Sequence, residues 1–176
     1  VADTLDDLPH ARAEGERVRE RLPTRLSWIG RGTTPDAVLS DLEGVSHFHF
    51  AGHGELLATD AWSTLLRLGP GAVLKIEDWV RAQPRLRLAV LDGCLTAGRT
   101  ARPGEIGFPQ AMLHLGTATV LAAMTSLEDR AAAEFIGDFY DAGGAEEPAA
   151  GYRAALAAAS ERGDSSAHAF VLFGLP

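Results

Sequence analysis

Two turns in the sequence carry the residue types that nucleophilic chemistry requires. One is Ala51-Gly52-His53-Gly54 and the other is Asp92-Gly93-Cys94-Leu95. A cysteine attacks a carbonyl carbon as its thiolate, so it needs an imidazole within reach to take its proton. It also needs backbone N–H groups that stabilise the oxyanion formed by the attack. We therefore expect His53 to act on Cys94, with the N–H groups of Gly54 and Cys94 as oxyanion donors.

Each turn follows an apolar segment that is typical of a buried strand. Residues 45–50 alternate, so that His47 and His49 lie on one face and the two phenylalanines lie on the other. Residues 86–91 form an almost continuous apolar run, which is typical of a strand buried on both faces. The two turns should therefore lie at the ends of two strands of one sheet.

The remaining pattern alternates helices with strands. Residues 55–72 mix short apolar runs with turn residues, which predicts an irregular excursion or a hairpin. Further helices are predicted over residues 9–22, 34–42, 75–82, 105–115, 128–140 and 148–159, and further strands over residues 25–29, 117–123 and 169–173. This order favours an α/β fold with a largely parallel sheet covered on both faces, in which functional groups gather at the carboxyl ends of the strands.

Composition excludes several classes of function. The 176 residues are 46% hydrophobic and 23% charged, which fits one globular domain with one core. The net charge is −8 and the 16 Lys and Arg residues are scattered, so no basic stripe is available for direct contact with nucleic acid. The longest apolar stretch, residues 106–124, is interrupted by Pro109, His114 and Gly116, so no membrane span is predicted.

The single cysteine and the first residues bear on the cellular setting. Because Cys94 is the only cysteine, no intrachain disulfide can form, which is typical of a reducing compartment, and we expect a cytoplasmic protein. Residues 1–7 are acidic where a signal peptide would be basic. The sequence has no initiator Met and enters a helical segment almost at once, so we expect a fragment of a longer chain.

Other chemistries fit the residues less well. His47, His49 and His53 could form a metal cluster, but zinc needs four ligands and no further His or Cys completes the set. Neither Gly52-His53-Gly54 nor Gly143-Gly144 is followed by the Lys-Ser or Lys-Thr pair of a phosphate-binding loop. We expect no bound metal and no cofactor.

Several segments resemble the CHAT peptidases, caspase-like domains that are often attached to tetratricopeptide repeats. The segment from His49 to Gly54 is similar to the histidine motif of that family, and the segment from Leu91 to Gly98 is similar to its cysteine motif. The resemblance extends over nearly the whole chain, to the early helix after Leu8, the turn Leu115-Gly116-Thr117-Ala118 and the closing strand at residues 169–174.

The resemblance implies a single domain over residues 1–176 with a three-layer α/β/α caspase-like sandwich and a mostly parallel central sheet. It assigns Cys94 as the nucleophile, His53 as its base, and Gly54 with Cys94 as the oxyanion donors. It also implies that the first strand of the family, which precedes the Leu-Pro helix, is absent here, and that a repeat or sensor domain lies upstream.

Two acids bear on substrate selection. In caspase-like folds the residue two before the nucleophile faces the pocket for the substrate side chain, and here that residue is Asp92. Asp129 matches an acid that separase-like members use near the same pocket. Two carboxylates would select Arg or Lys through charge-assisted hydrogen bonds. Alternatively, Asp92 caps the following turn and Asp129 stabilises the first turn of a helix.

Two functions remain open from the sequence. The first is a cysteine endopeptidase that cleaves protein or peptide substrates after a basic residue and is activated by a sensor or partner in a bacterial defence or signalling pathway. The second is a catalytically silent caspase-like interaction module. Reaction of Cys94 with iodoacetamide that depends on His53 would separate the two.

Overall fold

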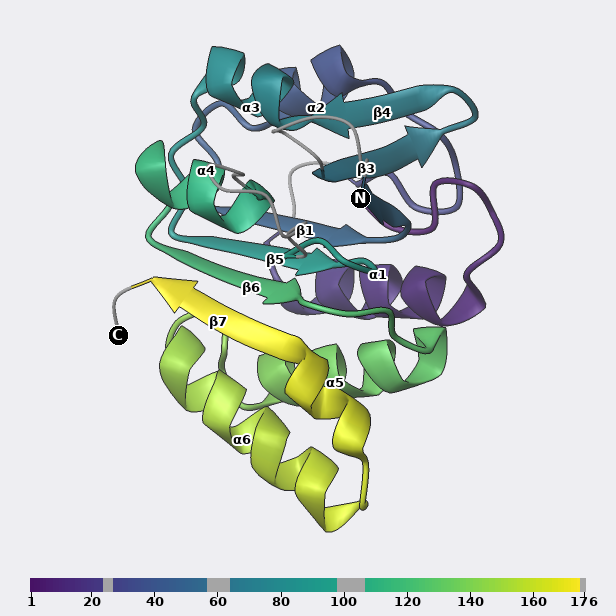
Figure 1. The fold of residues 1–176 in the computed structure, drawn as a ribbon, viewed down its shortest axis with the longest axis vertical. Coiled ribbons are helices and arrows are strands. Elements are labelled where there is room, and N and C mark those ends of the chain that lie inside the picture. Colours follow the sequence, from purple (N-terminus) through teal and green to yellow (C-terminus); the bar gives the residue numbers. More distant parts are fainter. Residues whose placement is uncertain (24–26, 57–63, 98–106, 175–176) are drawn as a thin grey trace.

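The computed structural model describes residues 1–23, 27–56, 64–97 and 107–174. Within these ranges the chain forms a central sheet with helices on both faces and a second, smaller sheet beside it (Figure 1). No helix in the described ranges has the length and apolar character needed to cross a membrane.

The central sheet has four strands in the order β1-β5-β6-β7. Its first three strands are parallel, and the last is antiparallel to its neighbour. All five residues of both β5 and β6 are buried, which accounts for their continuous apolar sequence. The strands are β1 (His47–Ala51), β5 (Leu88–Asp92), β6 (Thr119–Ala123) and β7 (Phe170–Gly174).

The second sheet is antiparallel and follows β1 directly. Its strands are β2 (Gly54–Leu56), β3 (Thr64–Gly69) and β4 (Ala72–Lys75). The turn between β3 and β4 contains Gly71 with φ at 75°. The sequence predicted an irregular excursion or a hairpin over residues 55–72. The described residues of this region belong to an antiparallel sheet of three strands.

The helices divide between the two faces of the central sheet (Figure 1). One face is covered by α2 (Pro35–Asp41), α3 (Ile76–Ala82) and α4 (Phe108–His114). The other is covered by α1 (Pro9–Arg21), α5 (Asp129–Asp141) and α6 (Pro148–Glu161), with a short 3-10 helix (Ser165–Ala169) before β7. The α/β/α layering and the mostly parallel sheet agree with the predicted fold class.

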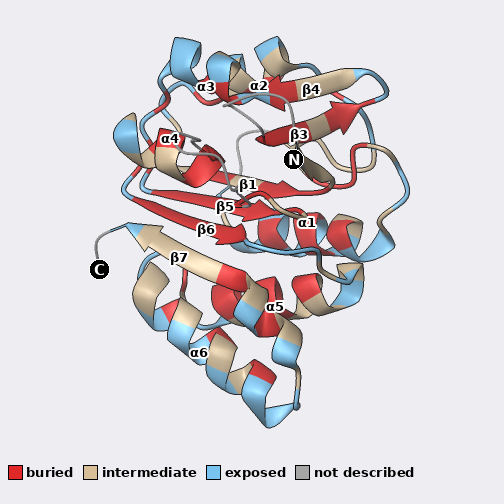
Figure 2. Ribbon diagram, in the orientation of Figure 1, coloured by how far each residue is buried: buried red, intermediate tan, exposed pale blue. Residues whose placement is uncertain are grey.

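Two apolar cores lie on opposite faces of the sheet (Figure 2). The first gathers around Trp79, which is fully buried and packs against Phe48 and Phe108. The second gathers around Phe135 and Phe170, whose rings stack 4.5 Å apart. Because β1, β5 and β6 supply side chains to one or both cores, the sheet holds their carboxyl ends in place.

Most predicted elements occur with ends shifted by a few residues. Thr34 caps α2 as expected, since its hydroxyl accepts a hydrogen bond from Ala37 N–H at 3.2 Å. Of the strand expected over residues 25–29, residues 25 and 26 lie outside the described ranges, and Ile29 forms a single parallel bridge to Ala2. The expected start of α4 at residue 105 also lies outside the described residues.

Candidate active site

The register of the sheet brings the two predicted turns together. β1 and β5 run parallel with Ala51 opposite Asp92, and Gly52 N–H donates to Asp92 O at 2.8 Å. His53 and Cys94 each stand two residues beyond that pair, on strands that lie about 5 Å apart. The turns that carry the two residues therefore lie side by side at the carboxyl edge of the sheet.

Gly54 lies directly against the backbone of Cys94. A Cβ atom at Gly54 would stand 2.3 Å from the carbonyl oxygen of Cys94 and 2.9 Å from Cγ2 of Thr96. No side chain fits there, so glycine at this position is required by packing as well as by any approach to a substrate carbonyl.

The ladder between β2 and β3 shows where the N–H of Gly54 points. Arg67 N–H donates to His53 O at 2.9 Å, so the Gly54–Leu66 pair is of the non-hydrogen-bonded kind. Hence the N–H of Gly54 points away from β3. The N–H of Cys94 has no hydrogen-bond partner in the described parts of the chain.

The turn that carries Cys94 is anchored to both neighbouring strands. The Thr96 hydroxyl donates to Leu91 O at 2.8 Å and accepts from Ala123 N–H at 3.2 Å, and Thr96 is fully buried. Leu95, which follows the cysteine, has φ at 58°, a left-handed conformation that is strained for a leucine. The thiol itself is half-buried and lies 3.8 Å from Leu127 O.

An acid that sequence reasoning missed contacts the predicted base. His53 Nε2 lies 3.0 Å from Asp7 Oδ1, and no described residue forms a hydrogen bond to the other ring nitrogen. Asp7 is positioned by Asp3, whose carboxylate accepts hydrogen bonds from the N–H groups of Asp7 and Leu8 at 2.8 and 2.9 Å. No spacing rule signals a pair so distant in sequence. The side chains of His53 and Asp7 are 39% and 53% exposed, so solvent screens their attraction.

Asp92 points into a buried polar cluster under the site. It is 6% exposed, and burial, followed by the neighbouring Glu14 carboxyl, raises its pKa well above the usual value. Burial also raises the pKa of Glu14 to about 8, and lowers that of His49 to about 3. At neutral pH His49 is therefore neutral, and protons remain on the acid pair.

Glu14 was not predicted as a site residue. Its carboxylate is buried, and Oε1 lies 2.9 Å from Nε2 of His49 at an angle too poor for a hydrogen bond. The other nitrogen of His49 lies 3.1 Å from the Tyr140 hydroxyl. His47 also has a protein partner, at 3.1 Å from Ala145 O, so both histidines contact the layer formed by α5 and the residues after it.

Asp129 is the first residue of α5 and binds the start of α1. Its two oxygens accept hydrogen bonds from the N–H groups of His10 and Ala11, both at 2.9 Å. These N–H groups lie in the first turn of α1, which a carboxylate stabilises. Its charge also contributes to the raised pKa of both Glu14 and Asp92, so the three acids lie in one region.

The fold is that of a cysteine-peptidase-like domain of the caspase type. Residues 2–167 match the model of the CHAT domain, and the chain belongs to this family. No curated protein sequence matches the chain significantly.

Separase and gingipain R are among the solved proteins that share the fold, both at low sequence identity. Separase in the separase–securin complex of Saccharomyces cerevisiae has 16% identity and a TM-score of 0.69, with 99% of this chain and 12% of that chain covered. The Arg-specific cysteine proteinase gingipain R has 13% identity and a TM-score of 0.62, with 99% of this chain and 44% of that chain covered. The present chain therefore spans less than half the length of either protein.

Proposed function

We propose that the protein is a cysteine endopeptidase in which Cys94 is the nucleophile and His53 is its base. The observation that carries the proposal is the β1–β5 register, which sets Gly54, the residue after His53, against the backbone of Cys94. Membership of the CHAT family and the fold shared with two proteases support the same reaction class.

The chemistry follows from these groups. His53 takes the thiol proton, and the Cys94 sulfur forms a bond to the carbonyl carbon of the scissile peptide. The resulting oxyanion accepts hydrogen bonds from the N–H groups of Gly54 and Cys94. His53 then gives its proton to the leaving amine as the C–N bond breaks, which leaves a thioester. Water, deprotonated by His53, hydrolyses the thioester and restores the thiol.

Asp7 has a positioning role in this scheme. Its carboxylate, at 3.0 Å from Nε2, favours the tautomer that keeps a proton on that nitrogen, so that Nδ1 is free to take the thiol proton. It also stabilises the imidazolium that forms when the thiolate does.

We also propose that the buried acids select a basic residue at the cut. Glu14 and Asp92 are both buried and hydrogen-bond to each other, and burial raises the pKa of both carboxyl groups, so the pair holds a proton at neutral pH. An arginine or lysine head would replace that proton as the hydrogen-bond donor and leave both carboxyl groups ionised. Asp129, whose oxygens already bind α1, would act through its charge.

The same proposal covers the setting of the enzyme. The single cysteine favours the cytoplasm. The resemblance to repeat-linked CHAT peptidases suggests control by an upstream repeat or sensor domain in a bacterial defence or signalling pathway, with protein substrates. The alternative is a silent interaction module.

The first test is iodoacetamide labelling of Cys94 near neutral pH, which does not require a substrate. Rapid labelling that falls at least tenfold in His53→Ala, but not in the exposed control His114→Ala, is expected for an activated thiol. Equal labelling of all three proteins would favour the silent module.

The second test is cleavage of a peptide library that varies the residue before the cut. We expect cleavage after Arg or Lys, and none in Cys94→Ala, which should remain folded. Cleavage that persists in Cys94→Ala would overturn the mechanism. A preference for acidic or apolar residues would overturn the role of the acids alone.

A further inference from the structure

The carboxylate of Asp3 is buried beside the proposed active site. Its side chain is 1% exposed, and Oδ1 accepts hydrogen bonds from the N–H groups of Asp7 and Leu8. Oδ2 accepts from Nε of Arg12 at 2.9 Å, and Nη2 of Arg12 lies 2.8 Å from the same oxygen. Removal of Arg12 would leave this carboxylate buried without its counter-charge, so the loop around it would have to open to hydrate it.

The turn that begins at Asp3 has a strained backbone. Asp3 has φ at 46° and Asp6 has φ at 62°, both in the left-handed region that residues other than glycine adopt infrequently. Asp6 N–H donates to Asp3 O at 3.2 Å, which closes the turn. Such strain persists only where the surroundings impose it. Arg12 binds the carboxylates of both residues, and these contacts supply the restraint.

Asp3 is the more important of the two partners of Arg12. The Asp6 side chain is 70% exposed, so solvent screens its attraction to the guanidinium. An asparagine at position 6 would also still accept a hydrogen bond from Arg12. The Asp3 carboxylate is buried, so its pairing with Arg12 is not screened in this way.

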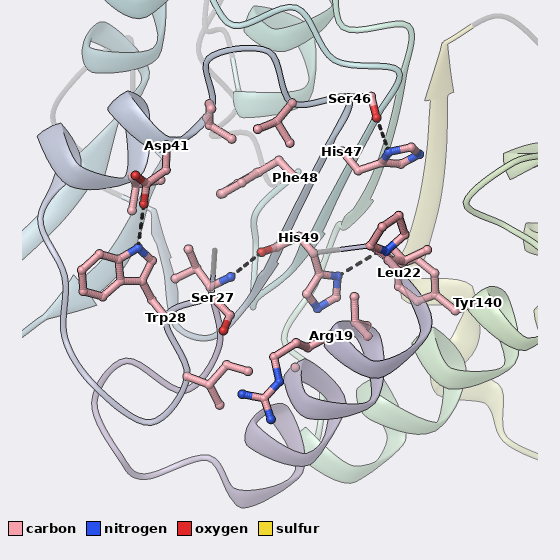
Figure 3. A pocket seen from close by; sticks show the side chains of 18 of the residues that line it. Arg19, Leu22, Ser27, Trp28, Asp41, Ser46, His47, Phe48, His49 and Tyr140 are labelled. Carbon is pink, nitrogen blue, oxygen red and sulfur yellow. Dashed lines mark hydrogen bonds between the residues drawn. The ribbon is translucent and has the colours of Figure 1, made fainter. Parts of the chain in front are cut away.

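The guanidinium of Arg12 also lies against the backbone at Gly30. A Cβ atom at Gly30 would stand 2.7–2.9 Å from Nη2, Cζ and Nε of Arg12, so no side chain fits between them. The segment that carries Gly30 is anchored in turn. Gly30 N–H donates to Ala2 O at 3.1 Å, and Nε1 of Trp28 donates to Oδ2 of Asp41 at 3.1 Å (Figure 3). The guanidinium is therefore held by this backbone as well as by the two carboxylates.

The loop after Asp3 connects this ion pair to His53. The Thr4 hydroxyl donates to Arg67 O at 2.8 Å, and Arg67 N–H donates to His53 O at 2.9 Å, so this end of the loop is tied to the backbone of His53. The other end of the loop presents Asp7 to Nε2 of His53. The position of Asp7 is set by the hydrogen bond from its N–H to the Asp3 carboxylate.

We propose that Arg12 is a positioning residue for the ring of His53. Arg12 holds the Asp3 carboxylate, Asp3 holds the peptide group of Asp7, and Asp7 keeps a proton on Nε2 of His53. The printed partners of the Arg12 guanidinium are Asp3 and Asp6, so Arg12 acts on the ring through the loop. The benefit to catalysis rests on the proposed function, in which Nδ1 takes the thiol proton.

The first test observes the His53 ring directly and needs no substrate. Ring ¹⁵N chemical shifts report which nitrogen carries the proton, and they can be recorded at pH 9, where a histidine is ordinarily neutral. His53→Ala identifies the signal. Because an exposed ion pair changes an equilibrium by at most about fivefold, we expect Arg12→Gln to lower the ratio of the Nε2–H to the Nδ1–H tautomer about threefold.

The matched control for this test is Arg162→Gln. The Arg162 side chain is 37% exposed, against 38% for Arg12, and it likewise lies beside two acids, Glu134 and Asp138. Its replacement should leave the tautomer ratio of His53 unchanged. An unchanged ratio in Arg12→Gln overturns the proposal, and so does an equal change in the two variants.

A second variant keeps the proposal testable if Arg12→Gln does not fold. Gly30→Ala retains the arginine but places a Cβ where the guanidinium lies, so the guanidinium must move relative to Asp3. Gly71→Ala is its control, because Gly71 has φ at 75°, close to the 62° of Gly30, and has open space around it. We expect a lower tautomer ratio in Gly30→Ala alone. Equal ratios in the two glycine variants would then overturn the proposal.

The effect on activity separates this inference from the proposed function. In Arg12→Gln, kcat for a cleaved peptide should fall no further than in Asp7→Asn, with KM unchanged. The double variant should be no slower than Asp7→Asn alone, because both changes act through one contact. Additive losses would overturn the route through Asp7. If the tautomer ratio changes as expected while Cys94 labelling does not depend on His53, the proposed function fails and the positioning role of Arg12 stands.

Discussion

The proposed catalytic residues are held by their neighbours rather than by each other. His53 is bound by Asp7, and Asp7 is bound by Asp3. Cys94 depends on the buried hydroxyl of Thr96, which ties its turn to β5 and β6. The positions of both proposed catalytic residues therefore depend on hydrogen bonds made by their neighbours.

Replacing Asp7 should test the positioning of His53. Asp7→Asn is expected to lower kcat about fivefold, because an exposed ion pair contributes at most about 1 kcal/mol. KM should change little, since Asp7 does not contact the substrate in this scheme. Asp6→Asn is the matched control, because Asp6 neighbours Asp7 but binds Arg12. An equal loss in both variants would argue for a general disturbance of the segment.

Glu14 should make stability depend on pH. Its folded pKa of about 8 exceeds the ordinary value of 4.5, so the folded state binds more protons between these values and stability falls as pH rises through them. Glu14→Gln should remove on the order of 1–3 kcal/mol of that fall between pH 5 and 8. The Val1 amine, lowered to about 5, contributes a rise in the same range in every variant.

Urea denaturation at pH 5, 6.5 and 8 measures this difference. The exposed Glu16→Gln on the same helix is the control and should keep the slope of the parent chain. If Glu14→Gln and the parent chain show the same slope, the carboxyl of Glu14 is already ionised in the folded state.

At the scale of elements, a substitution should disturb the site most where β2 lies against the turn that carries Cys94. Gly54→Ala would force a Cβ to within 2.3 Å of Cys94 O, so the two backbones must separate. We expect a loss of about 1–3 kcal/mol in stability from overpacking. Because displacement by about 1 Å can cost up to a hundredfold in rate, kcat/KM should fall tenfold or more.

The control for this prediction is Gly71→Ala. Gly71 has φ at 75° with open space around it, so alanine there strains the backbone away from the site. Its stability should fall while kcat/KM stays near that of the parent chain. A similar kcat/KM in both variants would show that the Gly54 contact does not position Cys94.

The sequence predicted the elements that are strongly periodic or continuously apolar. β5 and β6 were recognised because every residue in them is buried, and α2 because Thr34, Pro35 and Asp36 mark its start. The sequence did not predict three strands for the smaller sheet. The strand β2 is only three residues long, and its stability comes from pairing with β3.

The site was predictable only where residues adjoin a strand end. His53, Gly54 and Cys94 follow apolar strands, and the resemblance to a family pairs their motifs. Asp7 and Glu14 lie on other elements and reach the site through tertiary packing, which no local pattern encodes. Whether Asp92 and Asp129 bind substrate remains a prediction.

At the scale of the whole molecule, the two cores share one sheet and should unfold together. Phe135 is fully buried and stacks on Phe170 in one core, while Trp79 is buried in the other. Phe135→Ala should cost about 3–5 kcal/mol. We expect the transitions followed by circular dichroism and by tryptophan fluorescence to move together to lower urea. Separation of the two curves would mean that the cores unfold independently.

Residues 1–3 connect the end of β1 to the proposed active site. Ala51 N–H donates to Val1 O and Asp3 N–H donates to Ala51 O. The Asp3 carboxylate in turn accepts hydrogen bonds from the N–H groups of Asp7 and Leu8. A force applied at Val1 would therefore be transmitted through Asp3 to Asp7, which binds the His53 ring. Movement of a polypeptide attached at Val1 would therefore shift the His53 imidazole without any contact with the Cys94 thiol.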